Sequence, residues 1–154
     1  MRGCRLASGK SPGYTPPMDL ETVTPAAFAA TLRGVGLNLL TRDVRAFAAF
    51  AEVLGLSVHR LSDDFALLAH DGQFVQVHHD RTYGSHPALG LVPEGLRAGG
   101  VQVYLFGLDP DAAEARARAA GYEVIEPAAD KPHGLRECTV LAPEGQAFSP
   151  AVTA

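Results

Sequence analysis

The sequence predicts an α+β protein that contains two copies of one strand–helix–strand–strand–strand module, preceded by a short N-terminal helical arm. The first observation is an internal repeat at a constant offset of 66 residues, which begins where Val35 matches Val101. The second is that the same order of apolar and turn patterns follows in both halves. The third is that the matches include residues typical of helix ends. The matched pairs include Val35/Val101, Leu39/Leu105, Asp43/Asp109, Ala46/Ala112, Ala49/Ala115, Ala51/Ala117, Gly55/Gly121 and Val58/Val124.

Composition limits the classes of function. A chain of 154 residues with 47% hydrophobic residues is long enough for one packed domain, or for two small modules that share a core. The formal net charge is −4 and no basic cluster exceeds two residues, so we expect no nucleic-acid partner. No apolar run approaches the roughly 18 residues of a membrane span, so we expect no membrane partner. The two cysteines, Cys4 and Cys138, lie far apart in the sequence, which favours a reducing, cytoplasmic location over a disulfide framework.

The N-terminal part of the chain precedes the repeat. Residues 1–19 are rich in proline, glycine and serine, and we expect a disordered extension there. Thr24 followed by Pro25 is the pattern of a helix N-cap and a first helical residue. The alanine-rich helix that follows ends before Gly34. Residues 20–33 are therefore predicted to form a helical arm.

Module one is predicted to span residues 34–80. Its first strand covers residues 35–41, and Asp43 is the expected N-cap of a helix over residues 44–54. The helix carries a buried apolar stripe and ends at Gly55, a left-handed C-cap. The stripe consists of Phe47, Phe50 and Leu54. The module ends with the strands Leu56–Leu61, Phe65–His70 and Gln73–His79, the last two joined by the turn Asp71-Gly72.

A connector over residues 81–99, rich in glycine and proline, joins the two modules, and loops of this length in a compact domain are often functional. Module two, residues 100–152, repeats the order of module one. Its first strand, residues 101–106, is followed by Asp109 and Pro110 at the start of a helix that runs to about Ala120. The remaining elements are a strand Tyr122–Glu126, a polar turn Pro127–Gly134 and a hairpin formed by Leu135–Ala142 and Gln146–Val152.

Three stretches of this pattern resemble the vicinal-oxygen-chelate superfamily, which groups glyoxalase I, bleomycin-resistance proteins and extradiol dioxygenases. The first is LLTRDV at 39–44 running into FAEVLGL at 50–56, and the second is Asp109–Gly121. The third is HGLREC at 133–138 followed by APEGQ at 142–146. The resemblance implies one glyoxalase/bleomycin-resistance-like domain over residues 34–154. It also implies that the two βαβββ modules form a cup-shaped, curled mixed sheet.

The resemblance also directs attention to a metal site. In metal-dependent members the cup holds a divalent ion, bound by a His or Gln from each module's first strand and a Glu from each last strand. Glycine has no side chain, and neutral amides and hydroxyls are weak ligands for a divalent ion. We therefore expect no metal cofactor, with a divalent Zn, Ni, Mn or Fe ion as the alternative. The four corresponding positions hold Gly36, Gln76, Gln102 and Ser149.

Two groups of polar residues are candidates for the lining of the cup. Strand alternation places Gln76 and His78 on one face. His78 is then either a ligand-contacting group or general base, or a strand-end imidazole that faces solvent. Asn38 and Tyr104 are matched at the 66-residue offset, and they suit either recognition of a polar ligand or a half-buried polar pair.

A third group lies near the end of the chain, where Arg136 and Cys138 share one face of a strand. An inward Arg136 would bind a carboxylate or phosphate, and a rim salt bridge is the alternative. Cys138 is most simply a small core residue, and a reactive thiol would need a neighbouring base. The candidate ligand-binding residues are Asn38, Gln76, His78, Gln102, Tyr104, Arg136, Cys138 and Ser149, with His78 as the candidate catalytic residue.

Two classes of function fit these observations. The first is a metal-free protein that binds a small molecule in the cup, like the bleomycin-resistance branch. The alternative is a glyoxalase-like lyase or isomerase with a non-standard site that uses His78 and Gln102. The resemblance further implies a homodimer, and the apolar arm over residues 25–32 is expected to pack near the module interface or the partner chain.

Overall fold

The computed structural model describes residues 18–97 and 99–154. The described chain divides into two compact units, of which the first ends at Leu32 and the second begins at Arg33. In the first unit, helix α1 (Pro25–Ala29) begins as predicted, because the Thr24 side chain accepts a hydrogen bond of 3.2 Å from the Ala27 backbone N–H and Pro25 is the first helical residue. Most of the expected disordered extension, residues 1–17, lies outside the described residues.

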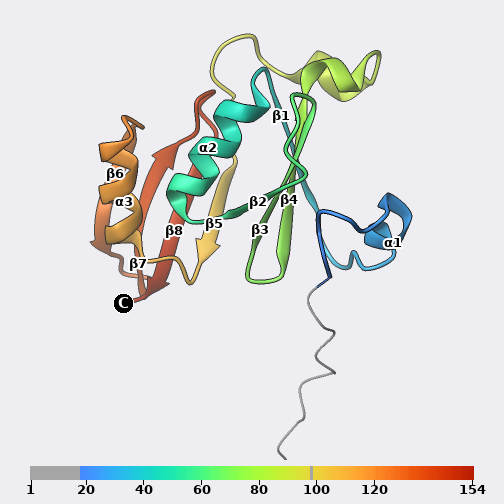
Figure 1. The fold of residues 1–154 in the computed structure, drawn as a ribbon. Helices are drawn as coiled ribbons and strands as arrows, with labels where there is room; N and C mark the ends of the chain where they lie inside the picture. The colour runs from blue at the N-terminus through green and yellow to red at the C-terminus, as the bar shows by residue number, and fades with distance from the viewer. Residues whose placement is uncertain (1–17, 98) are drawn as a thin grey trace, which may run out of the picture. The chain divides into compact units, whose positions relative to one another are not determined.

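Module one has the predicted element order (Figure 1). The Asp43 carboxylate accepts a 2.9 Å hydrogen bond from the Ala46 N–H at the start of the helix, and Gly55 ends the helix with a φ of 111°. The strands form a mixed sheet in the order β1-β4-β3-β2, with β1 parallel to β4 and the other pairs antiparallel. The elements are β1 (Leu37–Thr41), α2 (Val44–Leu54), β2 (Ser57–His59), β3 (Phe65–His70) and β4 (Gln73–His79).

Module two repeats this topology in the order β5-β8-β7-β6. The predicted polar turn over Pro127–Gly134 is wrong in its first half, because β6 continues through Pro127 to Asp130. Proline is tolerated there because β6 is an edge strand whose pairing with β7 is interrupted by two register shifts. The elements are β5 (Gln102–Phe106), α3 (Pro110–Ala119), β6 (Val124–Asp130), β7 (Leu135–Leu141) and β8 (Ala147–Thr153).

The eight strands form two separate, open four-stranded sheets instead of one continuous curled sheet. The physical reason is that β1 and β5 are both edge strands, each paired with a single neighbour, β4 and β8 respectively. The connector between the modules contains two short 3-10 helices, η1 (Asp80–Tyr83) and η2 (Pro87–Leu91). No helix among the described residues is long and apolar enough to cross a membrane.

One apolar core joins the two modules. The predicted stripe of α2 is fully buried, with Phe47, Phe50 and Leu54 all at 0% exposure. Phe148 of β8 packs edge-on against Phe47 and Phe50, with ring centroids 5.8 and 5.5 Å apart. Tyr122 of module two also packs edge-on against Phe50, at 5.1 Å. The two repeats therefore share one core, to which both helices contribute.

The modules also interlock through their hairpins. The β3–β4 hairpin of module one reaches β5, where His70 Nε2 lies 2.7 Å from the backbone oxygen of Phe106. The β7–β8 hairpin of module two reaches β1, where Gln146 Nε2 donates to the backbone oxygen of Leu40 at 3.4 Å. Because Leu40 and Phe106 are matched at the 66-residue offset, the two contacts are pseudo-symmetric.

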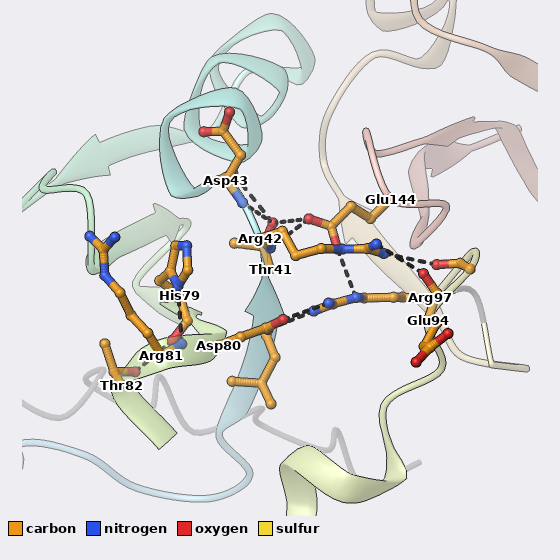
Figure 2. Close-up of polar contacts among 12 residues, drawn as sticks. Thr41, Arg42, Asp43, His79, Asp80, Arg81, Thr82, Glu94, Arg97 and Glu144 are labelled. Atoms are coloured by element: carbon orange, nitrogen blue, oxygen red, sulfur yellow. Dashed lines mark hydrogen bonds and ion pairs between the residues drawn. The ribbon is translucent and has the colours of Figure 1, made fainter. Parts of the chain in front are cut away.

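Glu144, at the tip of the module-two hairpin, strengthens the contact between this hairpin and β1 (Figure 2). Its carboxylate accepts hydrogen bonds from the Thr41 hydroxyl at 2.7 Å and from the Arg42 backbone N–H at 2.6 Å. The other carboxylate oxygen lies 2.7 Å from Nε of Arg97, a connector residue whose side chain is 7% exposed. Arg97 in turn donates two hydrogen bonds of 2.7 Å to Asp80 at the end of β4. The connector is thereby fastened to both modules.

We predict that Asp80→Asn lowers the free energy of unfolding by about 1.5–3 kcal/mol at pH 7, because a charge-assisted pair to a buried arginine is lost. The hydrogen bonds from Arg97 hold the pKa of Asp80 below its usual value. A depressed pKa in the folded state stabilises the protein above the unfolded-state pKa of about 3.9, and this contribution is lost as the pH falls through the folded-state pKa. Urea unfolding from pH 7 to pH 3 should show the difference between wild type and variant shrinking below about pH 4.

Asp63→Asn is the matched control for this measurement. The Asp63 carboxylate also pairs with an arginine, Arg45, but both side chains are exposed to solvent. An exposed pair contributes little to stability because water screens it. Equal losses of stability in the Asp63 and Asp80 variants would contradict a special role for the ion pairs that Arg97 makes with Asp80 and Glu144.

Candidate functional site

The predicted site residues lie mainly on the outer faces of the two sheets, which are the faces opposite the shared core. On β4, Val75 and Val77 pack toward the core, so alternation places Gln76 and His78 on the outer face. On β1, Leu39 packs toward the core, which places Asn38 on the outer face opposite Gln76 in the strand register. The structure thus brings Asn38, Gln76 and His78 to one surface.

His78 sits in a series of aromatic contacts on this surface. Its ring packs edge-on between Phe65, at 4.9 Å, and Tyr83, at 5.6 Å between centroids. Asn38 Nδ2 donates a hydrogen bond to the Tyr83 hydroxyl. Burial lowers the pKa of His78 below its usual value, so the imidazole is neutral at pH 7 and able to accept a proton. His86, at the N-terminus of η2, extends the series, with its ring 5.1 Å from Tyr83.

The outer face of the second sheet carries a hydrogen-bonded group of neutral side chains. Gln102 of β5 donates through its amide to the Ser149 hydroxyl at 2.7 Å and to the Thr139 hydroxyl at 3.3 Å. The two hydroxyls lie 3.0 Å apart and both residues are buried. This arrangement occupies the donors of Gln102 and orients its carbonyl oxygen.

A buried carboxylate lies beside this group. The Glu137 side chain on β7 is only 5% exposed, and it accepts a hydrogen bond from the Tyr104 hydroxyl at 3.3 Å. His133 Nε2 lies 3.1 Å from the other carboxylate oxygen. Burial, and then the nearby negative charge of Glu137, raise the pKa of Tyr104, so its hydroxyl stays protonated as a donor. The ring of Phe106, which is 60% exposed, stacks on Tyr104 with centroids 5.4 Å apart.

Sequence reasoning missed Glu137. The sequence did contain a clue to it. Arg136 and Glu137 are neighbours in a strand, so their side chains point to opposite faces of the sheet. Cys138 belongs to the core, so Arg136 lies on the helix-covered side with it, and Glu137 takes the outer face. Arg136 donates two hydrogen bonds of 2.6 Å to Asp111 at the start of α3 and one of 3.0 Å to Asp130, which raise its pKa. Arg136 therefore forms the rim salt bridge that was the alternative.

The predicted site residues fall into two groups, one on each sheet. In the described part of the chain, no hydrogen bond or ring contact joins Asn38, Gln76 or His78 on the first sheet to Gln102, Tyr104 or Ser149 on the second. Arg136 and Cys138 lie on the opposite side of the second sheet from these residues.

The positions that correspond to metal ligands in the resembling proteins carry weak donors. Gly36 precedes β1, and a Cβ atom added there would meet nothing within 4 Å. Gln102 and Ser149 bond to each other, and Gln76 is a neutral amide. Among residues 18–97 and 99–154, no three His, Cys, Asp or Glu side chains are grouped so that they could hold a metal ion.

The fold is shared with solved structures, although no protein-family model and no curated protein matches the chain. A glyoxalase/bleomycin resistance protein/dioxygenase family enzyme from Burkholderia phytofirmans PsJN is 19% identical and has a TM-score of 0.64, over 77% of this chain and 97% of its own. A glyoxalase/bleomycin resistance protein/dioxygenase from Nocardioides is 24% identical with a TM-score of 0.57, over 82% and 89%. A glyoxalase-related enzyme from Fulvimarina pelagi is 18% identical with a TM-score of 0.61, over 79% and 88%. These likenesses confirm the vicinal-oxygen-chelate fold.

We predict that Cys138 reacts slowly with thiol reagents in the folded protein. Its side chain is fully buried with Sγ 3.4 Å from the Pro110 backbone oxygen, and burial raises the pKa of the thiol to about 11. At pH 8 the lower thiolate fraction alone should slow the reaction on the order of 100-fold relative to an ordinary cysteine. The measurement is the rate with Ellman's reagent in a Cys4→Ser background, before and after unfolding in guanidinium. A fast reaction in the folded state would place Cys138 back among the reactive candidates.

Proposed function

We propose that this chain is a small-molecule-binding protein of the glyoxalase/bleomycin-resistance type, which holds a small organic ligand against the outer face of its second sheet without a divalent metal. The observation that carries the proposal is the buried Glu137 carboxylate beside the stacked rings of Tyr104 and Phe106. A carboxylate held away from water offers oriented hydrogen-bond acceptors, and an exposed ring pair offers a flat apolar surface. Together they suit a planar ligand that carries hydrogen-bond donors.

The neighbouring hydroxyl group supports the same proposal. Because Ser149 and Thr139 occupy the amide donors of Gln102, its carbonyl oxygen is held in one orientation. A fixed acceptor loses little conformational entropy when a ligand binds, so it contributes to affinity. Gln102 and Tyr104 alternate on the same side of β5, which places both residues on one surface.

The donor set does not suit a divalent metal. A hard cation prefers several carboxylates, and a transition metal prefers imidazole or thiolate ligands. The four positions hold glycine, two neutral amides and a hydroxyl, and two of these groups already satisfy each other. We therefore assign no step of the proposed function to a metal ion.

The alternative function is a glyoxalase-like lyase or isomerase that uses His78 as a general base. The neutral, partly buried imidazole of His78 favours it, because such a group accepts protons at pH 7. The hydrogen bonding of the two residues weighs against it, because His78 and Gln102 have different partners and no hydrogen bond joins them within the described chain. The binding function needs only one of the two faces, and for that reason we prefer it.

We predict that benzamide, used as a planar amide probe, shifts the amide resonances of Gln102, Tyr104 and Ser149 in protein-observed NMR. Tyr104→Phe and Glu137→Gln should each weaken binding by roughly 0.5–1.5 kcal/mol, because each variant removes one hydrogen-bonding group. His78→Ala is the control that separates the two functions, since it should leave benzamide binding unchanged. A glyoxalase activity that falls about 100-fold in His78→Ala would instead support the enzyme.

We predict that the purified protein contains less than about a tenth of an equivalent of Zn, Ni, Mn or Fe, because weak neutral donors retain no divalent ion through purification. Elemental analysis by mass spectrometry measures this directly. A stoichiometric metal that is lost in Gln102→Ala would contradict the proposal.

A further inference from the structure

A cavity of about 250 Å³ lies where the module-one hairpin meets β5. The cavity is separate from the part of the outer face that carries Gln102 and Ser149. Tyr104 and Phe106 border both the cavity and this outer face. The walls of the cavity come from both modules, so the cavity is part of the interlock between the repeats. The lining residues are Leu56, Leu68, His70, Asp71, Gln73, Val75, Val103, Tyr104, Leu105 and Phe106.

The pseudo-symmetric contact at the other hairpin is filled. There the Glu144 carboxylate is bonded to β1 and to the connector, and a Cβ atom added at Gly145 would lie 3.1 Å from Leu96. At the module-one hairpin a Cβ atom added at Gly72 would meet nothing within 4 Å. The duplicated interface is therefore packed at one end and hollow at the other, where His70 makes the hydrogen bond to β5.

Half of the residues that line the cavity are aliphatic. Leu56, Leu68 and Leu105 are buried core residues, and Val75 and Val103 pack against the same core. An apolar protein cavity of about 150 Å³ is large enough to bind benzene. The cavity here therefore has room for a six-membered ring with a substituent.

The polar residues that line the cavity indicate which substituent the bound ring would carry. Since the Phe106 backbone oxygen is an acceptor, His70 Nε2 carries the proton in this contact, and Nδ1 of the neutral ring is left as an acceptor. Nδ1 makes no hydrogen bond within the described chain. We infer that the cavity binds a small aromatic compound with a single hydroxyl or N–H donor, of the phenol class. This site is additional to the surface of the proposed function.

The test compares phenol with fluorobenzene, which has a similar size but no donor. Methyl-detected NMR should show both compounds shifting the methyl groups of Leu68, Val75, Val103 and Leu105. Phenol should bind about 2- to 10-fold more tightly, which is the range expected for one net hydrogen bond. Equal affinities would overturn the assignment of the donor, and unshifted cavity methyls at the highest soluble concentrations would overturn the site.

Val75→Phe places bulk inside the cavity and should abolish phenol binding, whereas Val35→Phe adds the same bulk at a residue that is 96% exposed and should leave binding unchanged. Val103→Leu is a milder filling substitution, which should weaken binding even if Val75→Phe prevents folding. Wild-type affinity in a folded filling variant would overturn the proposal. Gln102 and Ser149 do not line the cavity, whereas Leu68 and Val75 do, so the resonances of these two pairs report on the two sites independently.

Discussion

The shared aromatic core is the constraint on which the rest of this structure depends. Each helix packs on the sheet of its own module, and the two cores merge where Phe148 of module two lies beside Phe47 and Phe50 of module one. A module of one helix and four strands buries only a small share of its surface alone, so the shared core adds stability that a single module lacks. Once the helices share a core, the edge strands β1 and β5 are left to be covered by the hairpin of the opposite module.

The two ends of this interlock differ in chemistry. The contact at β1 is polar, and its buried arginine, Arg97, is paired with both Glu144 and Asp80. A buried charge that loses one partner is strongly destabilising, so this end tolerates little change. The contact at β5 has one hydrogen bond and an apolar hollow, in which substitutions have mainly a packing cost. The two modules are therefore joined by one ion-paired junction and one junction that encloses an apolar hollow.

Much of the fold follows from local sequence patterns, whereas the site depends on contacts that a sequence does not display. Asp43 and Gly55 mark the ends of α2 because cap geometry is a local property. The part of β6 beyond Glu126 was not predicted, because its edge position and register shifts depend on pairing with β7 and not on nearby residues. Alternation placed Arg136 and Cys138 on one face, but only the position of α3 decides that this face is covered. The side chains that meet Glu137 come from β5 and from the β6–β7 turn, and no spacing rule joins them.

Glu137 is a buried carboxylate whose partners are neutral or weakly basic side chains. It lies on β7, next to β8, and faces the same side of the sheet as Ser149. The Tyr104 hydroxyl and the imidazole of His133 are its hydrogen-bonding partners. A carboxylate stabilised in this way keeps lone pairs for further donors, because two partners do not saturate its acceptor capacity. Free lone pairs on a buried carboxylate are what the proposed function requires of this surface.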